Sequence, residues 1–114
     1  MARIYKILSA IEWHDAEVRG RFEGSRVDQQ DGFIHFSTAA QAPETARRYF
    51  AGLLGLMVLE VEADDLGAAL KWEPSRGGDL FPHLYAPLDC AHVIEAREAP
   101  LGDDGLPDLG VLKS

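Results

Sequence analysis

Apolar residues occur along the chain in short runs that are separated by polar segments containing glycine. Residues 3–8 are β-prone and predict a first strand, and residues 56–62 form an almost continuous apolar run that is typical of a central strand. The shorter runs 32–37, 71–73, 84–85 and 91–98 predict further strands.

A first helix is predicted directly after the first strand. Ser9 and Glu12 form a Ser-x-x-Glu capping box, and Gly20 suits the residue that follows the last helical turn. We expect this helix to carry Trp13 into the core and to be followed by a loop over residues 20–32.

A second helix is predicted after the strand at 32–37. Thr38 and Gln41 repeat the capping pattern, and Pro43 is tolerated because it falls in the first turn. The apolar residues that follow are spaced by three or four and predict one buried stripe, made of Ala42, Ala46, Tyr49, Phe50 and Leu53.

The order of these elements indicates the fold class. The later strands follow one another without helices between them, which favours an α+β fold with a small mixed or antiparallel sheet over a parallel α/β fold. The 114 residues suit one domain, which we expect over residues 1–98. Residues 99–114 are rich in Gly, Pro and Asp and predict a tail that is irregular or ordered by docking.

Composition narrows the range of functions. The formal charge of −8 disfavours binding to nucleic acid, although a local pocket could still hold a small anion. The sequence contains no apolar run long enough for a membrane span and no secretory signal pattern. Its single cysteine, Cys90, fits a reducing compartment, so we expect a cytoplasmic protein. The oligomeric state does not follow from the sequence.

The predicted strand at 32–37 carries the first candidate site. Alternation places Phe33, His35 and Ser37 on one face. Ser37 and Thr38 lie where a helix begins, and the free N–H groups there favour anions. The alternative is that Thr38 only caps the helix and His35 is bonded within the fold.

Residues 72–85 carry the second candidate site. If the chain is extended here, Phe81, His83 and Tyr85 share a face and form a wall for a planar or sugar-like ligand. The alternative is a core cluster. Pro82 places this stretch at an edge or a bend, and its peptide bond with Phe81 could be cis or trans.

Two charged residues accompany the second segment. Glu73 lies beside Trp72 and could act as an acid or base, or could be a solvated carboxylate at a strand end. Arg76 lies in a Gly-rich loop and could bind an anion or be simply exposed. The four histidines show no spacing typical of metal ligands, so we expect no metal site, although His35 and His83 with a carboxylate remain an alternative.

Several motifs together resemble those of a bacterial and plant family known as domain of unknown function 952. They are Ile4-Tyr5-Lys6-Ile7, Trp13, Gly32-Phe33-Ile34-His35-x-Ser37, Leu59-Glu60-Val61, Trp72-Glu73-Pro74 and Leu80-Phe81-Pro82-His83-Leu84-Tyr85-x-Pro87-Leu88. The likeness spans about residues 3–97. The resemblance implies no activity, because the name of the family states that none was assigned.

A more distant resemblance concerns the fold. The family looks similar to ADP-ribosyltransferases and to the transferases that remove an RNA 2′-phosphate. In those enzymes an early strand carries a His or Arg. A second strand, which leads into a helix, carries a short segment made of an aromatic residue or His, an apolar residue and Ser. His35-Phe36-Ser37 resembles the second element, and Tyr5-Lys6 occupies the place of the first. Many relatives carry His where this chain has Lys6, and a protonated lysine cannot accept a hydrogen bond from a ribose hydroxyl.

These resemblances leave two functions open. The first is a glycosyl or ADP-ribosyl transferase, or a binder of NAD or a phosphorylated nucleoside. His35, Glu73 and His83 would be its catalytic residues, and the ligand-binding residues would be Lys6, Ser37, Thr38, Arg76, Phe81 and Tyr85. The second is a non-catalytic module that binds a small ligand or regulates another protein.

Overall fold

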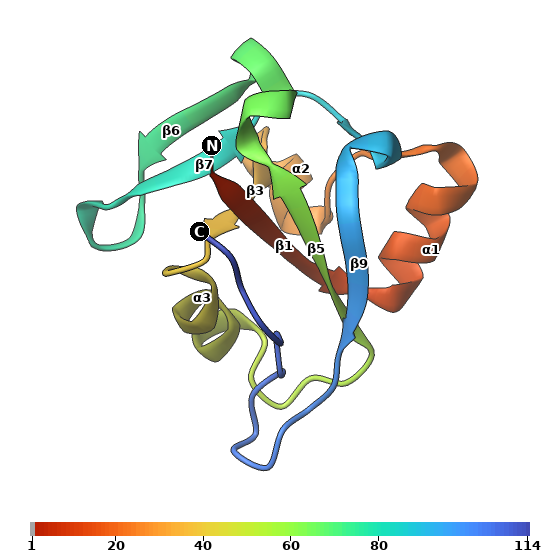
Figure 1. Ribbon diagram of the computed structural model, residues 1–114, viewed down its shortest axis with the longest axis vertical. Helices are drawn as coiled ribbons and strands as arrows, with labels where there is room; N and C mark the ends of the chain where they lie inside the picture. The colour runs from red at the N-terminus through yellow and green to blue at the C-terminus, as the bar shows by residue number, and fades with distance from the viewer. Residues whose placement is uncertain (1) are drawn as a thin grey trace.

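A computed structural model describes residues 2–114 and contains a central antiparallel sheet. Its four strands lie in the order β4 (Ser37–Thr38), β1 (Arg3–Ser9), β5 (Leu56–Glu62) and β9 (Val93–Ala99). Strand β5 pairs with β1 along its whole length and with β9 on its other side, and its residues from Leu56 to Val61 are buried, which explains why the run at 56–62 is almost wholly apolar. Figure 1 shows β5 between β1 and β9.

A second sheet lies beside the first and carries both segments singled out in the sequence. Its order is β3 (Ile34–His35), β7 (Leu80–Leu84) and β6 (Leu70–Pro74), and a short pair joins β2 (Arg21–Phe22) to β8 (Leu88–Asp89). Every pairing is antiparallel. The prediction of an α+β fold with a small antiparallel sheet is therefore confirmed.

The helices are short. They are α1 (Ala10–Arg19), α2 (Arg26–Asp31) and α3 (Ala42–Tyr49), with 3₁₀ segments η1 (Ala63–Ala69), η2 (Arg76–Gly78) and η3 (Cys90–His92). The described peptide bonds are trans, including the bond before Pro82.

Helix α1 begins and ends as the sequence predicts. The Ser9 hydroxyl accepts from the Glu12 amide at 3.1 Å, and the Glu12 carboxylate accepts from the Ser9 amide at 3.0 Å. Gly20 ends the helix in the left-handed conformation, with φ of 82°. Trp13 is buried in the core, as expected.

The prediction of a loop over residues 20–32 was wrong, because α2 lies within it. Ser25 and Asp28 form a capping box of the same type as the one in α1. Asp28 is the buried residue of this six-residue helix. A helix that buries a carboxylate in place of an apolar stripe gives no periodic signal, which explains why the pattern of apolar residues does not reveal it.

The single strand expected at 32–37 is interrupted at Phe36. The part before it, β3, pairs with β7, and the part after it, β4, pairs with β1. The Phe36 amide donates to the Pro82 carbonyl at 3.0 Å, so the chain stays attached to β7 as it changes sheets. Ser37 is therefore opposite Tyr5 in the central sheet and does not continue the row of Phe33 and His35.

The buried stripe expected on the second helix is shorter than predicted. Ala42 and Ala46 are buried, but the side chains of Tyr49 and Leu53 are 64% and 46% exposed. Helix α3 ends at Tyr49, so Leu53 lies beyond the helix, where a spacing of three or four no longer corresponds to one helix face.

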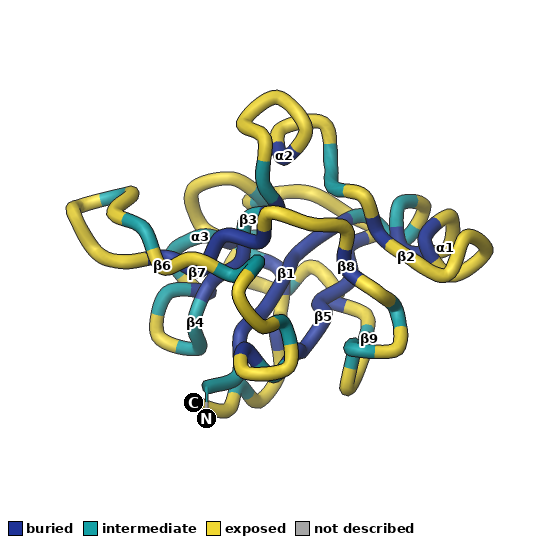
Figure 2. The backbone as a smooth tube through the Cα atoms, turned by 90° about the horizontal axis from the view of Figure 1, so that it is seen from above, coloured by how far each residue is buried: buried dark blue, intermediate teal, exposed yellow. Residues whose placement is uncertain are grey.

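The core consists of two clusters, one on each face of the central sheet. Alternation along β1 sends Ile4 and Leu8 to the cluster that includes Trp13, and sends Tyr5 and Ile7 to the cluster beneath α3. Figure 2 shows β1 and β5 as buried segments at the centre, while the end of the β6–β7 hairpin is exposed.

Candidate functional site

The structure brings the two candidate segments into direct contact. His35 of β3 lies opposite His83 of β7, with 5.6 Å between the ring centroids. The ring of Phe33 contacts both, at 4.5 Å from His35 and 4.0 Å from His83. The Tyr85 ring lies 5.3 Å from Phe33. We call this group, made of Phe33, His35, His83, Tyr85 and Glu73, the histidine face.

Glu73 holds one side of the histidine face through two hydrogen bonds to the same oxygen. Its Oε1 lies 2.9 Å from Nδ1 of His83 and accepts from the Tyr85 hydroxyl at 2.7 Å. The bond from Tyr85, and then that from His83, lower the pKa of Glu73, and the same contact raises the pKa of Tyr85. Glu73 is therefore an anion at neutral pH and acts as an acceptor.

The ring of His83 is oriented by this carboxylate. Because Nδ1 donates to Glu73, the neutral ring carries its lone pair on Nε2. No side chain or backbone group of residues 2–114 makes a hydrogen bond to Nε2, and no polar side-chain atom in this range is both buried and unpartnered. His83 is only 4% exposed, so its ring lies almost wholly within the fold, and Nε2 is its nitrogen without a hydrogen-bond partner among the described residues.

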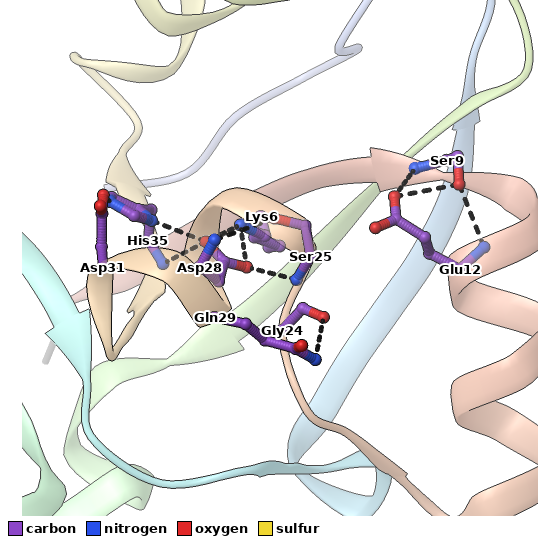
Figure 3. A network of polar contacts seen from close by, with 9 residues as sticks. All are labelled: Lys6, Ser9, Glu12, Gly24, Ser25, Asp28, Gln29, Asp31 and His35. Atoms are coloured by element: carbon purple, nitrogen blue, oxygen red, sulfur yellow. Dashed lines mark hydrogen bonds and ion pairs between the residues drawn. The ribbon is translucent and has the colours of Figure 1, made fainter.

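His35 lies between two carboxylates. Its Nδ1 is 2.6 Å from Asp28, and its Nε2 is 2.9 Å from Asp31 (Figure 3). Asp28 also accepts from the backbone amide of His35 at 3.1 Å. With a carboxylate at each ring nitrogen, the His35 ring is held in one orientation.

Lys6 of β1 neutralises the charge of Asp28. Its Nζ lies 2.9 Å and 2.8 Å from the two carboxylate oxygens, and both side chains are buried. Burial lowers the pKa of Lys6, which the carboxylate partly offsets. Burial opposes ionisation of Asp28 as well, but the bonds from His35 and Lys6 outweigh it and hold the Asp28 pKa well below its usual range. The ammonium of Lys6 thus points toward Asp28, within the fold.

Sequence reasoning missed Asp28, as it missed Asp31 and Thr45. Asp28 accepts from Lys6, from His35 and from the Ser25 amide, so one carboxylate joins β1, α2 and β3. The signal that could have identified it is the Ser-x-x-Asp pattern at Ser25, which resembles the capping box recognised at Ser9.

A second group of predicted residues gathers around Thr45 at the first turns of α3. The hydroxyl of Ser37 lies 2.9 Å from that of Thr45, and Arg76 donates to the same hydroxyl at 3.3 Å. The Arg76 guanidinium also lies 4.9 Å from the centre of the Phe81 ring. Phe81 and His83 are two residues apart in β7, so their side chains lie on the same face of the strand. The group around Thr45 and Phe81 therefore adjoins the histidine face.

Thr38 has a structural role. Its amide donates to the Gln41 side chain at 3.1 Å, and its hydroxyl accepts from the Gln41 amide at 3.2 Å. This reciprocal pair closes the turn before α3 rather than capping the helix itself, because Gln41 occupies the N-cap position.

Two hollows of the molecule lie apart from the rings of the histidine face. One hollow of the molecule lies beside Trp72 and Leu70, and another lies between α1 and β2. Neither of these hollows is lined by His35 or His83. Among residues 2–114, no group of three or more His, Cys, Asp or Glu side chains is arranged to hold a metal ion.

The fold and the histidine face together define a small α+β domain built from antiparallel sheets. A sequence model of the family described as "Protein of unknown function (DUF952)" matches residues 7–96, and the chain belongs to this family. Within the described range, no helix is both long enough and apolar enough to cross a membrane.

Solved structures of the protein CC0527 from Caulobacter crescentus are similar to this chain. A crystal structure is 54% identical, with a TM-score of 0.90 and coverage of 92% of each chain. A solution NMR structure is 55% identical, with a TM-score of 0.87, and covers 96% of this chain and 95% of that one. No curated protein matches the sequence.

Proposed function

We propose that the histidine face binds a phosphorylated nucleoside or NAD-like ligand and carries out a glycosyl or ADP-ribosyl transfer. The observation that carries this proposal is the hydrogen-bonded chain from Tyr85 through Glu73 to His83. A carboxylate that fixes the tautomer of a histidine and leaves Nε2 without a partner is the usual construction of a general base.

In this reaction the glycosidic bond of the ligand breaks and a bond to an acceptor hydroxyl forms. His83 Nε2 takes the proton of the acceptor as the new bond forms. The leaving base departs with the electron pair of the broken bond, and positive charge develops on the ribose. The Glu73 carboxylate, which is already anionic, stabilises that charge through space.

The neighbouring residues supply binding. Phe33 and Tyr85 offer aromatic surface for a planar base. Arg76 and the hydroxyl of Thr45 lie close to the first turn of α3, where a phosphate group finds positive charge and hydrogen-bond donors. The resemblance of the family's fold to ADP-ribosyltransferases supports the same class of ligand, as an analogy of folds.

A second candidate is a module that binds such a ligand without turnover. Two observations favour it. The ammonium of Lys6 is neutralised by Asp28, and both ring nitrogens of His35 already face carboxylates. On this alternative, His35 is a structural support and the ligand is bound but not converted.

Thermal unfolding with NAD and a panel of nucleotides tests the proposal. We expect saturable stabilisation, about 2.7 kcal/mol at a ligand concentration of 100 times Kd. The stabilisation should be lost in His83→Gln and retained in His92→Gln, since His92 lies in η3, outside the histidine face. Mass spectrometry of the incubated ligand separates the two candidates, because only the transferase forms product. No stabilisation by any nucleotide at millimolar concentration would contradict both.

A further inference from the structure

Two aromatic rings beside His83 each carry a basic side chain. The Arg76 guanidinium lies 4.9 Å from the centre of the Phe81 ring, and the Lys71 ammonium lies 5.3 Å from the centre of the Tyr85 ring. Phe81 and Tyr85 are four residues apart in an extended stretch, so their Cα atoms are separated by about 13 Å. A positive charge therefore lies on each side of His83.

These two positive charges lack an acidic partner within the protein. Most basic residues form ion pairs with carboxylates, as Arg97 does with Glu95. Among residues 2–114, Lys71 and Arg76 form no such pair, although the chain has 19 acidic and only 11 basic residues. Arg76 donates to the Thr45 hydroxyl, and most of its five N–H groups remain for an external acceptor.

Glu73 supplies a negative charge between the two positive ones. Its carboxylate is hydrogen-bonded to Tyr85 and to His83, and these bonds, together with Lys71 at longer range, lower the pKa of Glu73. The charges along the histidine face therefore alternate from positive at Arg76 through negative at Glu73 to positive at Lys71.

A ligand that matches this alternation has an anionic group at each end and positive charge in its middle. We propose that the ligand carries two separate phosphate groups, one bound by Arg76 and the other by Lys71, with its ribose beside Glu73. This inference rests on the proposed function, in which positive charge develops on the ribose. It narrows the ligand to nucleotides that have a phosphate group on each side of the ribose.

The two basic side chains are suited to different parts of this task. Arg76 is half-buried and held by Thr45 and Phe81, so its planar guanidinium is positioned to bind one phosphate group through two hydrogen bonds. Lys71 is exposed, and its flexible stem lets the ammonium approach a second phosphate group while it stays near Tyr85.

Calorimetric titration of the full-length chain with two adenine nucleotides tests the proposal. We expect adenosine 3′,5′-bisphosphate to bind about fivefold more tightly than adenosine 5′-monophosphate, the effect of one exposed ion pair. Lys71→Gln should abolish this preference. Lys113→Gln is the matched control, because it removes the same charge from a residue whose backbone is bonded to Tyr5, on the other face of the central sheet. This control should retain the preference.

Arg76→Gln tests the other end of the row. It should weaken the binding of both nucleotides about tenfold, because both place a phosphate group on the guanidinium. Circular dichroism of each variant without ligand verifies that the fold is retained. Equal affinity of the unaltered chain for the two nucleotides, or a preference that survives Lys71→Gln, would overturn the proposal.

His83→Gln separates this inference from the proposed function. If the bisphosphate preference is absent but binding still depends on His83, the two phosphate positions are wrong and the proposed function stands. If the preference depends on Lys71 and binding is unaffected by His83→Gln, the phosphate positions are supported and the role of His83 is contradicted. No binding of either nucleotide at millimolar concentration overturns both.

Discussion

Asp28 illustrates how one residue determines the geometry of the histidine face. Its carboxylate is buried, yet it accepts from Lys6, from His35 and from the Ser25 amide. A buried carboxylate is tolerated only when its lone pairs are satisfied and its charge is balanced. The orientation of His35 therefore depends on a residue that lies outside both segments that the sequence singles out.

We predict that Asp28→Asn destabilises the protein by about 3–5 kcal/mol, because the buried ammonium of Lys6 loses its counter-charge. Urea unfolding measures the change. Asp31→Asn is the matched control, since its side chain is 48% exposed and also contacts His35, and it should cost less than about 1 kcal/mol. Equal effects of the two substitutions would contradict this account of Asp28.

The same carboxylate predicts how stability depends on pH. The pKa of Asp28 is lower in the folded chain than in the unfolded chain, where it is about 3.9. The unfolded chain therefore binds more protons in acid, and stability is lost as the pH falls below about 4. Unfolding midpoints between pH 2.5 and 6 should fall steeply in the unaltered chain and less in Asp28→Asn. Parallel curves would contradict the prediction.

At the scale of elements, the sequence correctly predicts the helix ends and strands that depend on local patterns of residues. The capping box at Ser9, the end of α1 at Gly20 and the central strand β5 depend on neighbouring residues or on one apolar run, and all are as predicted. The break at Phe36 depends on the carbonyl of Pro82, which is distant along the chain. No local pattern contains that information, so Ser37 was wrongly placed in the row of His35.

For the candidate site, too, the sequence predicts properties of a single strand but not contacts between segments that are distant along the chain. Alternation along β7 correctly places Phe81 and His83 on one face, because that property belongs to a single strand. The contact between His35 and His83 depends on the register of β3 with β7. The partners of Lys6 and Arg76, which are Asp28 and Thr45, arise from tertiary packing and could not be read from either motif.

We predict that Ser9→Ala destabilises the protein by about 1 kcal/mol, because the Glu12 amide at the start of α1 loses its acceptor. Chemical unfolding monitored by circular dichroism measures this. Ser75→Ala is the control, since Ser75 is exposed and makes no capping hydrogen bond, and it should change stability by less than about 0.5 kcal/mol. An equal loss in both variants would show that the cap contributes nothing.

At the scale of the whole molecule, β1 separates two distinct surfaces. Lys6 supports the histidine face through Asp28 on one face of the central sheet, and Tyr5 binds the C-terminal residues 109–114 on the other. Substitutions in residues 109–114 should therefore leave ligand binding at the histidine face unchanged as long as the fold is intact.

The central claim is that the histidine face, and no other part of the surface, receives the nucleotide-like ligand. Nuclear magnetic resonance of the histidine rings during titration with NAD and nucleotides tests it most directly. His14 is exposed on α1 and His92 lies in η3, so both serve as internal controls. We predict saturable shifts at His35 and His83 with the two controls unmoved. Unchanged rings across the panel, or equal shifts at all four histidines, would contradict the claim.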